Sequence, residues 1–386
     1  MLYIKQNLAI MRFDFMRKVW VMNFPFIDLK AQYNAYKDEI DTAIAGVLQS
    51  TSFIGGAALD EFEANLAKYV GVKNAIGCSS GTSALVLALL ALNIKQGDEV
   101  IVPSFTFIAT AEMVSLLGAT PVFADISLDD YNVSIESIKH LVSEKTKAVI
   151  AVSIFGQMPD LLALNEFCKS KNIVLIEDGA QSFGAIQDIG GGQLKKSCSI
   201  APLSCTSFFP SKPLGAYGDA GAVFTNDDAL AKKIRTILNH GQKERYKHEI
   251  IGINGRLDSI QAAILNVKLR HLDDELAKRE QIAQIYQKRL QNGILPHIKK
   301  GFTSVYAQYS VRVQERLKCI EKLTAKGIPT AIHYPLGLHL QEAFKSLGYK
   351  KGSLPNTELV SEQILSLPMS AFLDEAHQNE VIKAFE

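Results

Sequence analysis

DEVIVPSFTFIATAEMVSLLGATPVFAD, residues 98–125, decides the fold class of this 386-residue chain. Its apolar runs at 99–102 and 121–125 are short, continuous and bounded by turn residues, so each predicts a strand. The segment 108–117 between them has the composition and length of a helix. A strand, a helix and a second strand of this size predict a βαβ unit, in which the two strands run parallel.

The same alternation continues along most of the chain. Continuous apolar strands separated by helices predict a mainly parallel sheet that helices cover on both faces. In such a sheet, binding sites form at the carboxyl ends of the strands. Further helices are predicted at 30–50, 58–69, 82–92, 134–142 and 160–170, and further strands at 148–154, 173–177 and 220–225.

Beyond residue 258 the pattern becomes helical and charged. Segments 257–280 and 281–291 predict long helices, and 305–313 and 330–333 resemble strands. We therefore predict a large domain over 23–265 and a smaller C-terminal α+β domain over 266–386.

Composition excludes several classes of protein. Hydrophobic residues make up 47% and charged residues 21%, as in a globular enzyme, and the net charge of +1 gives no support for a nucleic-acid partner. The five cysteines form no CxxC pair. We therefore expect no metal site and no disulfide framework, and we expect a reducing cytoplasmic location.

The first 22 residues mix basic and apolar side chains without a sustained apolar core. This pattern argues against a signal peptide. We predict that residues 1–22 are a start-site extension and that Met22 is the native start; a short membrane-surface segment is the alternative. Since no stretch approaches about 18 consecutive apolar residues, we expect no membrane-spanning helix.

A lysine in the segment CTSFFPSKPLGA, residues 205–216, is the first candidate catalytic residue. Lys212 lies between two prolines, which fix φ and remove backbone donors, so we expect it on a constrained turn. An ordinary solvated lysine is the alternative. Asp178 ends the apolar run 173–177, so we expect a carboxylate held at a buried strand end. A helix N-cap is the alternative for Asp178.

Residues 79–83, SSGTS, precede the apolar helix predicted at 82–92. Free N–H groups at a helix start attract phosphate, and glycine permits close approach, although an ordinary N-cap has the same composition. An amine, a carboxylate and a phosphate cradle are together what a pyridoxal phosphate site requires. Gln181 and Phe107 are further candidates, for hydrogen bonding to the ring and for stacking on it; a turn cap and a core aromatic are their alternatives.

Ten segments in order along the chain resemble the DegT/DnrJ/EryC1/StrS sugar aminotransferases. The resemblance implies the aspartate-aminotransferase fold of type I: a large domain with a mainly parallel seven-stranded sheet between helices, and a smaller C-terminal domain. It also implies the cofactor pyridoxal 5′-phosphate. The matching segments are 26–29, 80–82, 97–100, 106–110, 117–119, 177–182, 207–221, 254–258, 261–263 and 333–335.

The resemblance assigns a role to each matching residue. Lys212 resembles the family's Schiff-base lysine, and Asp178 the partner of the pyridinium nitrogen. Because lysine rather than histidine stands at position 212, transamination is favoured over dehydration. Gln181 corresponds to the residue at the phenolic oxygen and Phe107 to the aromatic on the ring. The implied phosphate contacts are Gly81, Thr82 and Ser207, with Asn254 donated by the neighbouring subunit of a homodimer.

Within the family, the chain resembles the subgroup that aminates UDP-2-acetamido-2-deoxy-3-oxo-glucuronate, with glutamate as donor, for surface polysaccharide or glycan biosynthesis. The likeness lies in 206–215, 304–309 and 331–335. It implies a substrate site formed by Arg256, His333, Tyr334 and, from the partner subunit, His240. Arg256 is expected to bind a carboxylate or pyrophosphate; anchoring of the Asn254 loop is its alternative.

The chain departs from the family pattern in three places. Ala220 stands where the family usually has glycine, Glu112 stands where many members have asparagine, and 186–199 fits the pattern poorly. A C4-keto UDP-sugar or a C3-keto dTDP-hexose is therefore an alternative substrate, and a non-catalytic cofactor-binding regulator is an alternative of another class. A nicotinamide oxidoreductase is disfavoured because no G-x-G-x-x-G fingerprint follows a strand.

Overall fold

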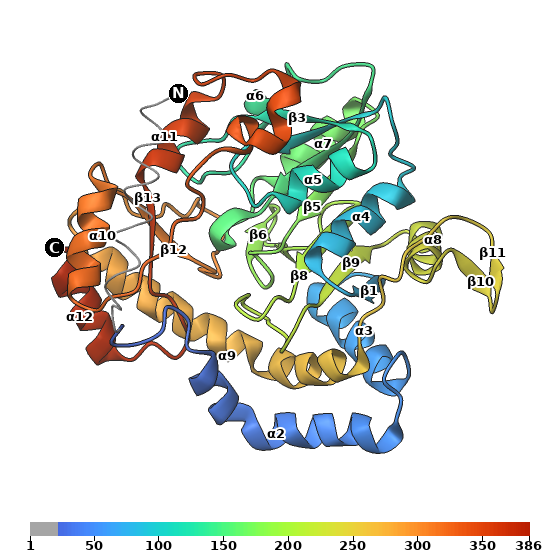
Figure 1. The fold of residues 1–386 in the computed structure, drawn as a ribbon, viewed down its shortest axis with the longest axis horizontal. Coiled ribbons are helices and arrows are strands. Elements are labelled where there is room, and N and C mark those ends of the chain that lie inside the picture. Colours follow the sequence, from blue (N-terminus) through green and yellow to red (C-terminus); the bar gives the residue numbers. More distant parts are fainter. Residues whose placement is uncertain (1–21) are drawn as a thin grey trace.

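The structure is a computed structural model that describes residues 22–386 (Figure 1). The extension predicted at 1–22 lies outside the described residues except for Met22. A seven-stranded sheet forms the centre, with the strand order β1-β9-β8-β5-β4-β2-β3. Its strands are β1 (Asn74–Cys78), β2 (Glu99–Pro103), β3 (Thr120–Ala124), β4 (Thr146–Val152), β5 (Val174–Asp178), β8 (Leu203–Ser207) and β9 (Gly221–Thr225).

Only β9 runs antiparallel to its neighbours in this sheet. It pairs in that sense with β1 and β8, whereas β8, β5, β4, β2 and β3 pair in parallel. The predicted mainly parallel seven-stranded sheet is thereby confirmed. Because the parallel strands all end at one edge, their C-terminal residues meet there, and β5 ends there in Asp178.

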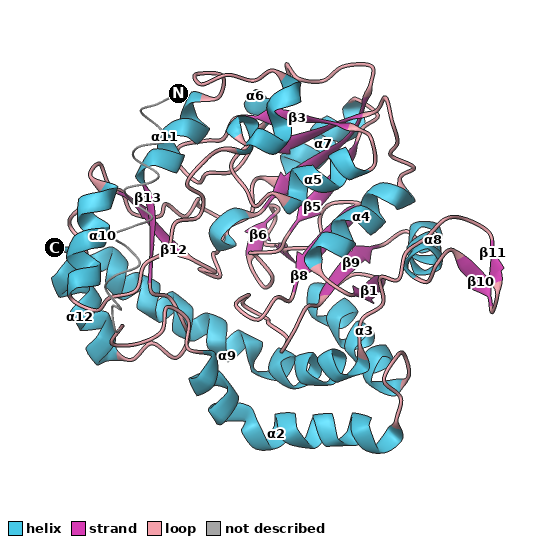
Figure 2. Cartoon of the chain, in the orientation of Figure 1, coloured by secondary structure: helices cyan, strands magenta, loops and turns pink. Residues whose placement is uncertain are grey.

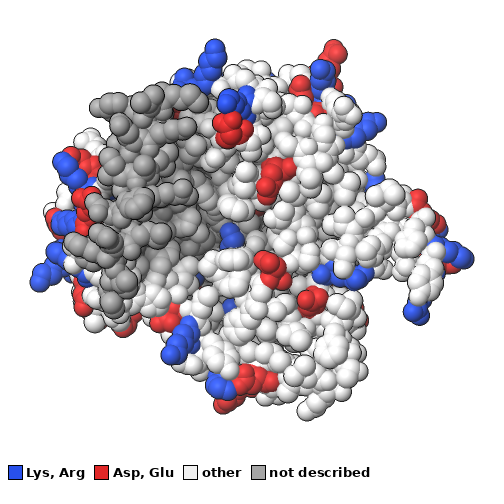
Figure 3. All heavy atoms as spheres, in the orientation of Figure 1, with Lys and Arg blue, Asp and Glu red and all other residues white. Residues whose placement is uncertain are grey.

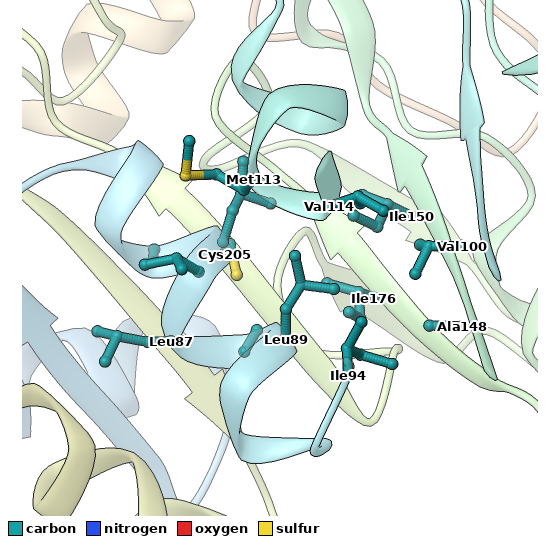
Figure 4. Close-up of a cluster of buried hydrophobic side chains, with 14 of the residues drawn as sticks. Leu87, Leu89, Ile94, Val100, Met113, Val114, Ala148, Ile150, Ile176 and Cys205 are labelled. Atoms are coloured by element: carbon teal, nitrogen blue, oxygen red, sulfur yellow. The ribbon is translucent and has the colours of Figure 1, made fainter. Parts of the chain in front are cut away.

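Helices cover both faces of the sheet (Figure 2). One face packs against α4 (Gly81–Ala91), α5 (Ala109–Leu116) and α8 (Asp228–Leu238). Figure 4 shows part of this core, to which α4 contributes Leu87 and Leu89 and the sheet contributes Val100, Ile150 and Ile176. Alternate strand residues point to the opposite face, where α6 (Ile135–Ile138) and α7 (Leu161–Ser170) lie.

Three longer helices frame this core. α2 (Leu29–Ser50) and α9 (Ser259–Arg289) lie side by side, and α3 (Ala57–Val70) packs between α9 and the sheet (Figure 1). α9 continues into a smaller C-terminal part with its own core around Tyr286 and Tyr309. That part contains β12 (Tyr309–Arg312), β13 (Ile364–Leu367), α10 (Arg316–Ala325), α11 (Pro355–Gln363) and α12 (Glu375–Phe385).

Short elements complete the fold. One hairpin, β10 (Gln242–Glu244) with β11 (Lys247–His248), projects from the body beside α8 (Figure 1). A second hairpin joins β6 (Ile186–Asp188) and β7 (Leu194–Lys196). The 3₁₀ turns are η1 (Ile154–Gly156), η2 (Leu338–Leu340) and η3 (Glu342–Leu347).

The C-terminal half differs from expectation in three places. The two helices predicted at 257–280 and 281–291 are one helix, α9, because charged residues on its exposed side do not interrupt its backbone. The strand predicted at 305–313 is limited to β12, and that predicted at 330–333 makes only an isolated bridge from Ala331 to Ser366. The domain boundary predicted near residue 265 falls inside α9 and stays a prediction.

The surface of the described part is mixed in charge. On the face shown in Figure 3, acidic and basic side chains are interspersed around large uncharged areas. Between residues 22 and 386, no helix combines the length and the apolar character needed to cross a bilayer.

Removing buried volume from α4 tests the packing of this core. Leu89→Ala should lower the free energy of unfolding by about 2–5 kcal/mol, because Leu89 is fully buried and its loss leaves a cavity. Leu116→Ala on α5 is the matched control; that side chain is 71% exposed, so we expect a change within about 0.5 kcal/mol. Urea unfolding measures both. Equal losses in the two variants would contradict the packing described here.

Candidate active site

A cavity of about 490 Å³ lies at the carboxyl ends of the parallel strands. β4, β5 and β8 contribute their last residues to its wall, and α4 and α5 contribute their first turns. The cavity brings together all the predicted cofactor residues except Asn254. Its lining residues with predicted roles are Gly81, Thr82, Phe107, Asp178, Gln181, Ser207, Lys212, His333 and Tyr334.

Asp178 presents a buried carboxylate to this cavity. Its Oδ2 accepts a hydrogen bond from Thr110 Oγ1 at 2.8 Å, and its Oδ1 accepts one from Ala180 N at 3.2 Å. Burial raises the pKa of Asp178, while these two donors and the charge of Lys212 oppose that rise. The donors hold the carboxylate in place, and both are neutral. Asp178 caps no helix, so the N-cap alternative is wrong.

Lys212 lies on an irregular turn, as its flanking prolines predicted. Its own N–H donates to Phe209 O at 2.8 Å, and Ala216 N closes the turn by donating to Phe208 O at 2.7 Å. Burial lowers the pKa of Lys212, and the charge of Asp178 opposes that effect. Since the side chain lines a cavity, the alternative of an ordinary solvated lysine is wrong.

The start of α4 forms a cradle of hydrogen-bond donors. Ser80 caps the helix by accepting from Ser83 N at 3.0 Å, which leaves the first helical N–H groups without partners in the helix. A Cβ on Gly81 would lie 2.6 Å from Ser207 Cβ. Glycine therefore brings the hydroxyl of Ser207 close to the helix start, where the dipole also favours an anion.

Gln181 is held from both ends of its amide. Its Oε1 accepts from Phe155 N at 2.8 Å, and its Nε2 donates to the Tyr334 hydroxyl at 3.1 Å. Phe107 is 56% exposed and lies 6.3 Å from the ring of Tyr334, centroid to centroid. The alternative that Phe107 is an ordinary core aromatic is therefore wrong, since its ring lines the cavity.

Asn254 and Arg256 line a second cavity, of about 510 Å³, which shares Ser80 and Asp219 with the first. Arg256 donates from Nη1 to Asn239 Oδ1 at 2.8 Å, and its Nε is buried with no partner among the described residues. His240 is exposed and lines neither cavity. The single chain thus does not bring these three residues to Lys212, and their predicted roles stay predictions.

Several residues that line the cavity had no predicted role. Thr110 is one turn from Phe107, and its contact with Asp178 spans 68 residues of sequence. Gln308 reaches the cavity from the C-terminal part. Both lie in segments that carry the family resemblance, which was the one available signal for them. Others are Leu85, Thr106, Phe209, Ser211 and Asp219.

None of the departures from the family pattern lines the cavity. Ala220 is buried in the core near α3 and α9, whereas a Cβ on the next residue, Gly221, would lie 2.4 Å from Ser80 O. The position that requires glycine is therefore Gly221. Residues 186–199 form the β6–β7 hairpin and its return, and none lines the cavity of the described chain.

Comparison with known proteins shows the family of this chain. The sequence profile of the DegT/DnrJ/EryC1/StrS aminotransferase family matches residues 34–386. The chain belongs to this family. UDP-2-acetamido-2-deoxy-3-oxo-D-glucuronate aminotransferase of Pseudomonas aeruginosa is 46% identical over 91% of this chain and 96% of that protein. A pleiotropic regulatory protein of Geobacillus stearothermophilus is 41% identical over 94% of this chain and 97% of that protein.

Solved structures of family members share the fold. An aminotransferase of this family from Brucella abortus is 39% identical, with a TM-score of 0.89 over 94% of this chain and 98% of that chain. NtdA of Bacillus subtilis, solved with bound cofactor PMP, is 28% identical, with a TM-score of 0.86 over 96% of this chain and 85% of that chain. The expected fold type is confirmed, and so is the expected family of pyridoxal-phosphate aminotransferases.

The charge of Lys212 can be detected through His333. Burial and the charge of Lys212 together lower the pKa of His333 to about 4, and burial has the larger effect. Lys212→Ala should therefore raise the pKa of His333 in the cofactor-free protein, as measured by NMR titration. Lys350→Ala removes an exposed lysine and is the matched control. An unchanged pKa in Lys212→Ala would contradict the proximity of the two side chains.

The same shift has a consequence for stability. Since the folded pKa of His333 lies below its ordinary value of 6.5, the unfolded chain binds this proton first as the pH falls. The free energy of unfolding should therefore decrease between about pH 6.5 and pH 4, and this part of the decrease should be absent in His333→Gln.

Proposed function

We propose that this chain is a pyridoxal 5′-phosphate-dependent aminotransferase that converts a nucleotide-linked keto sugar into an amino sugar, with glutamate as the amino donor. The observation that carries the proposal is the cavity that holds the amine of Lys212, the buried carboxylate of Asp178 and the free start of α4 together. These are the three groups that the cofactor requires.

The residues fit the cofactor in charge and size. Asp178 receives only neutral hydrogen-bond donors, so a protonated ring nitrogen would supply a cationic partner for its buried carboxylate. The N–H groups at Gly81 and Thr82, with the Ser207 hydroxyl, suit a phosphate. Phe107 offers an exposed ring for stacking. The volume of about 490 Å³ lies in the range of small-molecule sites.

The chain's own residues account for orientation and proton transfer. When bound, pyridoxal phosphate supplies an electron sink for the carbon that loses a proton. Asp178, whose carboxylate is fixed by Thr110, would supply negative charge to the ring nitrogen of the bound cofactor. Burial favours the neutral amine of Lys212, which is the form that attacks a carbonyl and accepts a proton. We assign to this amine the removal of the proton from the α carbon of glutamate in the first half of the reaction, and the delivery of a proton to the aminated sugar carbon in the second half.

The proposed substrate is UDP-2-acetamido-2-deoxy-3-oxo-glucuronate, for polysaccharide or glycan biosynthesis. Support comes from the relative that is 46% identical over 91% of this chain, and from His333 and Tyr334, which line the cavity, where the resemblance expects them. A C4-keto UDP-sugar and a C3-keto dTDP-hexose are the alternative substrates. A regulatory role has one observation in its favour, the name of a 41% identical relative, but regulation alone gives no use for Lys212 beside Asp178.

A panel of UDP- and dTDP-linked keto sugars, each assayed with glutamate, tests the proposed function. We expect turnover of the UDP-linked 3-oxo uronic acid and loss of turnover in Lys212→Ala. Turnover of a neutral keto sugar in place of the acid would contradict the substrate. No turnover of any keto sugar by cofactor-loaded protein would contradict the function.

We also propose a homodimer with shared sites that works in the cytoplasm. Asn254 is exposed near the Lys212 cavity, so its side chain is accessible to the cofactor site of a neighbouring copy. All five cysteines are free, as is usual in a reducing compartment.

Mixing two inactive variants tests shared sites. Lys212→Ala and Asn254→Ala subunits should recover part of the wild-type activity on mixing, because each mixed dimer would contain one site with both residues intact. Mass spectrometry of the mixture confirms that subunits have exchanged. After confirmed exchange, activity no higher than that of the separate variants would count against shared sites.

Arg256→Lys tests recognition of the substrate's carboxylate or pyrophosphate. Lysine keeps the charge but loses the two-pronged donor geometry, so we expect KM for the sugar to rise about 10–100-fold. Arg316→Lys is the matched control, since Arg316 binds main-chain oxygens of Ser361 and Ile364. A loss of about 1–3 kcal/mol in stability with an unchanged KM would show that Arg256 only anchors its loop through Asn239.

A further inference from the structure

A second lysine, Lys268 on α9, is buried and has no role in the site described above. It is 2% exposed, and its Nζ donates to the main-chain oxygen of Gly215. No carboxylate forms an ion pair with it in the described chain. The nearby carboxylate of Glu275 accepts from Gln32 Nε2 at 2.9 and 2.8 Å. Burying a lysine amine whose one hydrogen-bond acceptor is a carbonyl contributes little to stability, so the position of Lys268 needs another explanation.

The carbonyl that Lys268 binds belongs to the turn that carries Lys212. That turn is tight: a Cβ on Gly215 would lie only 2.3 Å from Pro210 O. Gly215 is also buried, so its oxygen has little access to water. Without Lys268 this oxygen would lose its bonding partner, and the turn would lose its attachment to the rest of the protein.

A second residue of the same helix face holds the next part of the turn. Gln261 lies two helical turns before Lys268; its Oε1 accepts from Tyr217 N at 2.9 Å, and its Nε2 donates to Tyr217 O at 3.3 Å. Lys268 Nζ also lies 5.2 Å from the centroid of the Tyr217 ring. Residues 215–217 are therefore attached to α9, and α9 packs against both α2 and α3 (Figure 1).

We propose that Lys268 is a positioning residue for Lys212. By holding the Gly215 carbonyl, it fixes the turn against α9 and so fixes the place of the Lys212 amine in the cavity. The inference rests on the proposed function, in which that amine must reach two carbon atoms in turn. A displacement of about 1 Å at such a group costs up to about a hundredfold in rate.

Lys268→Met and Lys233→Met form a matched pair for the test. Methionine keeps most of the packing volume and removes the donor and the charge. Lys233 also binds a main-chain carbonyl, Ala91 O at 2.7 Å, but at the end of α4 away from the cavity. A merely structural lysine would behave alike in the two variants.

Hydrogen exchange in the cofactor-free protein is the first measurement. In Lys268→Met, the amides of Lys212 and Ala216, which close the turn, should exchange about tenfold faster or more, because the turn opens locally. Steady-state kinetics are the second measurement. We expect kcat to fall about 10–100-fold while KM for the sugar changes little, since reaction geometry rather than binding is affected. Lys233→Met should show neither change.

Unchanged exchange and unchanged kcat in Lys268→Met would overturn the proposal, and so would a rise in KM alone. If Lys268→Met does not fold, Gln261→Met removes the neighbouring attachment at Tyr217 and should cause smaller changes in the same direction. If the wild-type protein aminates no keto sugar, the proposed function fails, whereas the exchange comparison still decides whether Lys268 holds the turn.

Discussion

Two opposite charges with little access to water, the amine of Lys212 and the carboxylate of Asp178, set the main constraint on this structure. Burial lowers the pKa of the lysine and raises that of the aspartate, so each side chain is driven toward its neutral form. Each also partly restores the charge of the other. The pair therefore places an amine whose charge is opposed by burial beside a carboxylate that a cationic ring nitrogen would stabilise.

The surrounding fold supplies what this pair needs. The parallel strands β5 and β8 are neighbours, so Asp178 and the turn after Ser207 emerge at the same edge of the sheet. α5 contributes Thr110 to orient the carboxylate, and α4 contributes a helix start for an anion. α9 holds the Lys212 turn from outside through Lys268. A rigid scaffold around a site is what precise positioning of reacting groups requires.

Local patterns were enough to predict a mainly parallel sheet and five of its seven strands, and to single out Lys212 as a candidate; β1 and β8 were not predicted. The five predicted strands are continuous apolar runs buried on both faces, and Lys212 is marked by its two prolines, so composition and spacing reveal them. The continuity of α9 was missed because its exposed side is charged in the middle. Contacts such as Thr110 with Asp178 and Lys268 with Gly215 join residues 68 and 53 positions apart, and only the three-dimensional fold brings them together.

The most direct test of this account is to locate the cofactor's point of attachment. Borohydride reduction of the pyridoxal-phosphate-loaded protein, followed by peptide mass mapping, should find the reduced cofactor on Lys212 alone. Lys268 is the informative comparison, because it is a buried lysine that binds the same turn. Modification of Lys268 or any other lysine, with Lys212 unmodified, would contradict the assignment on which the proposed function depends.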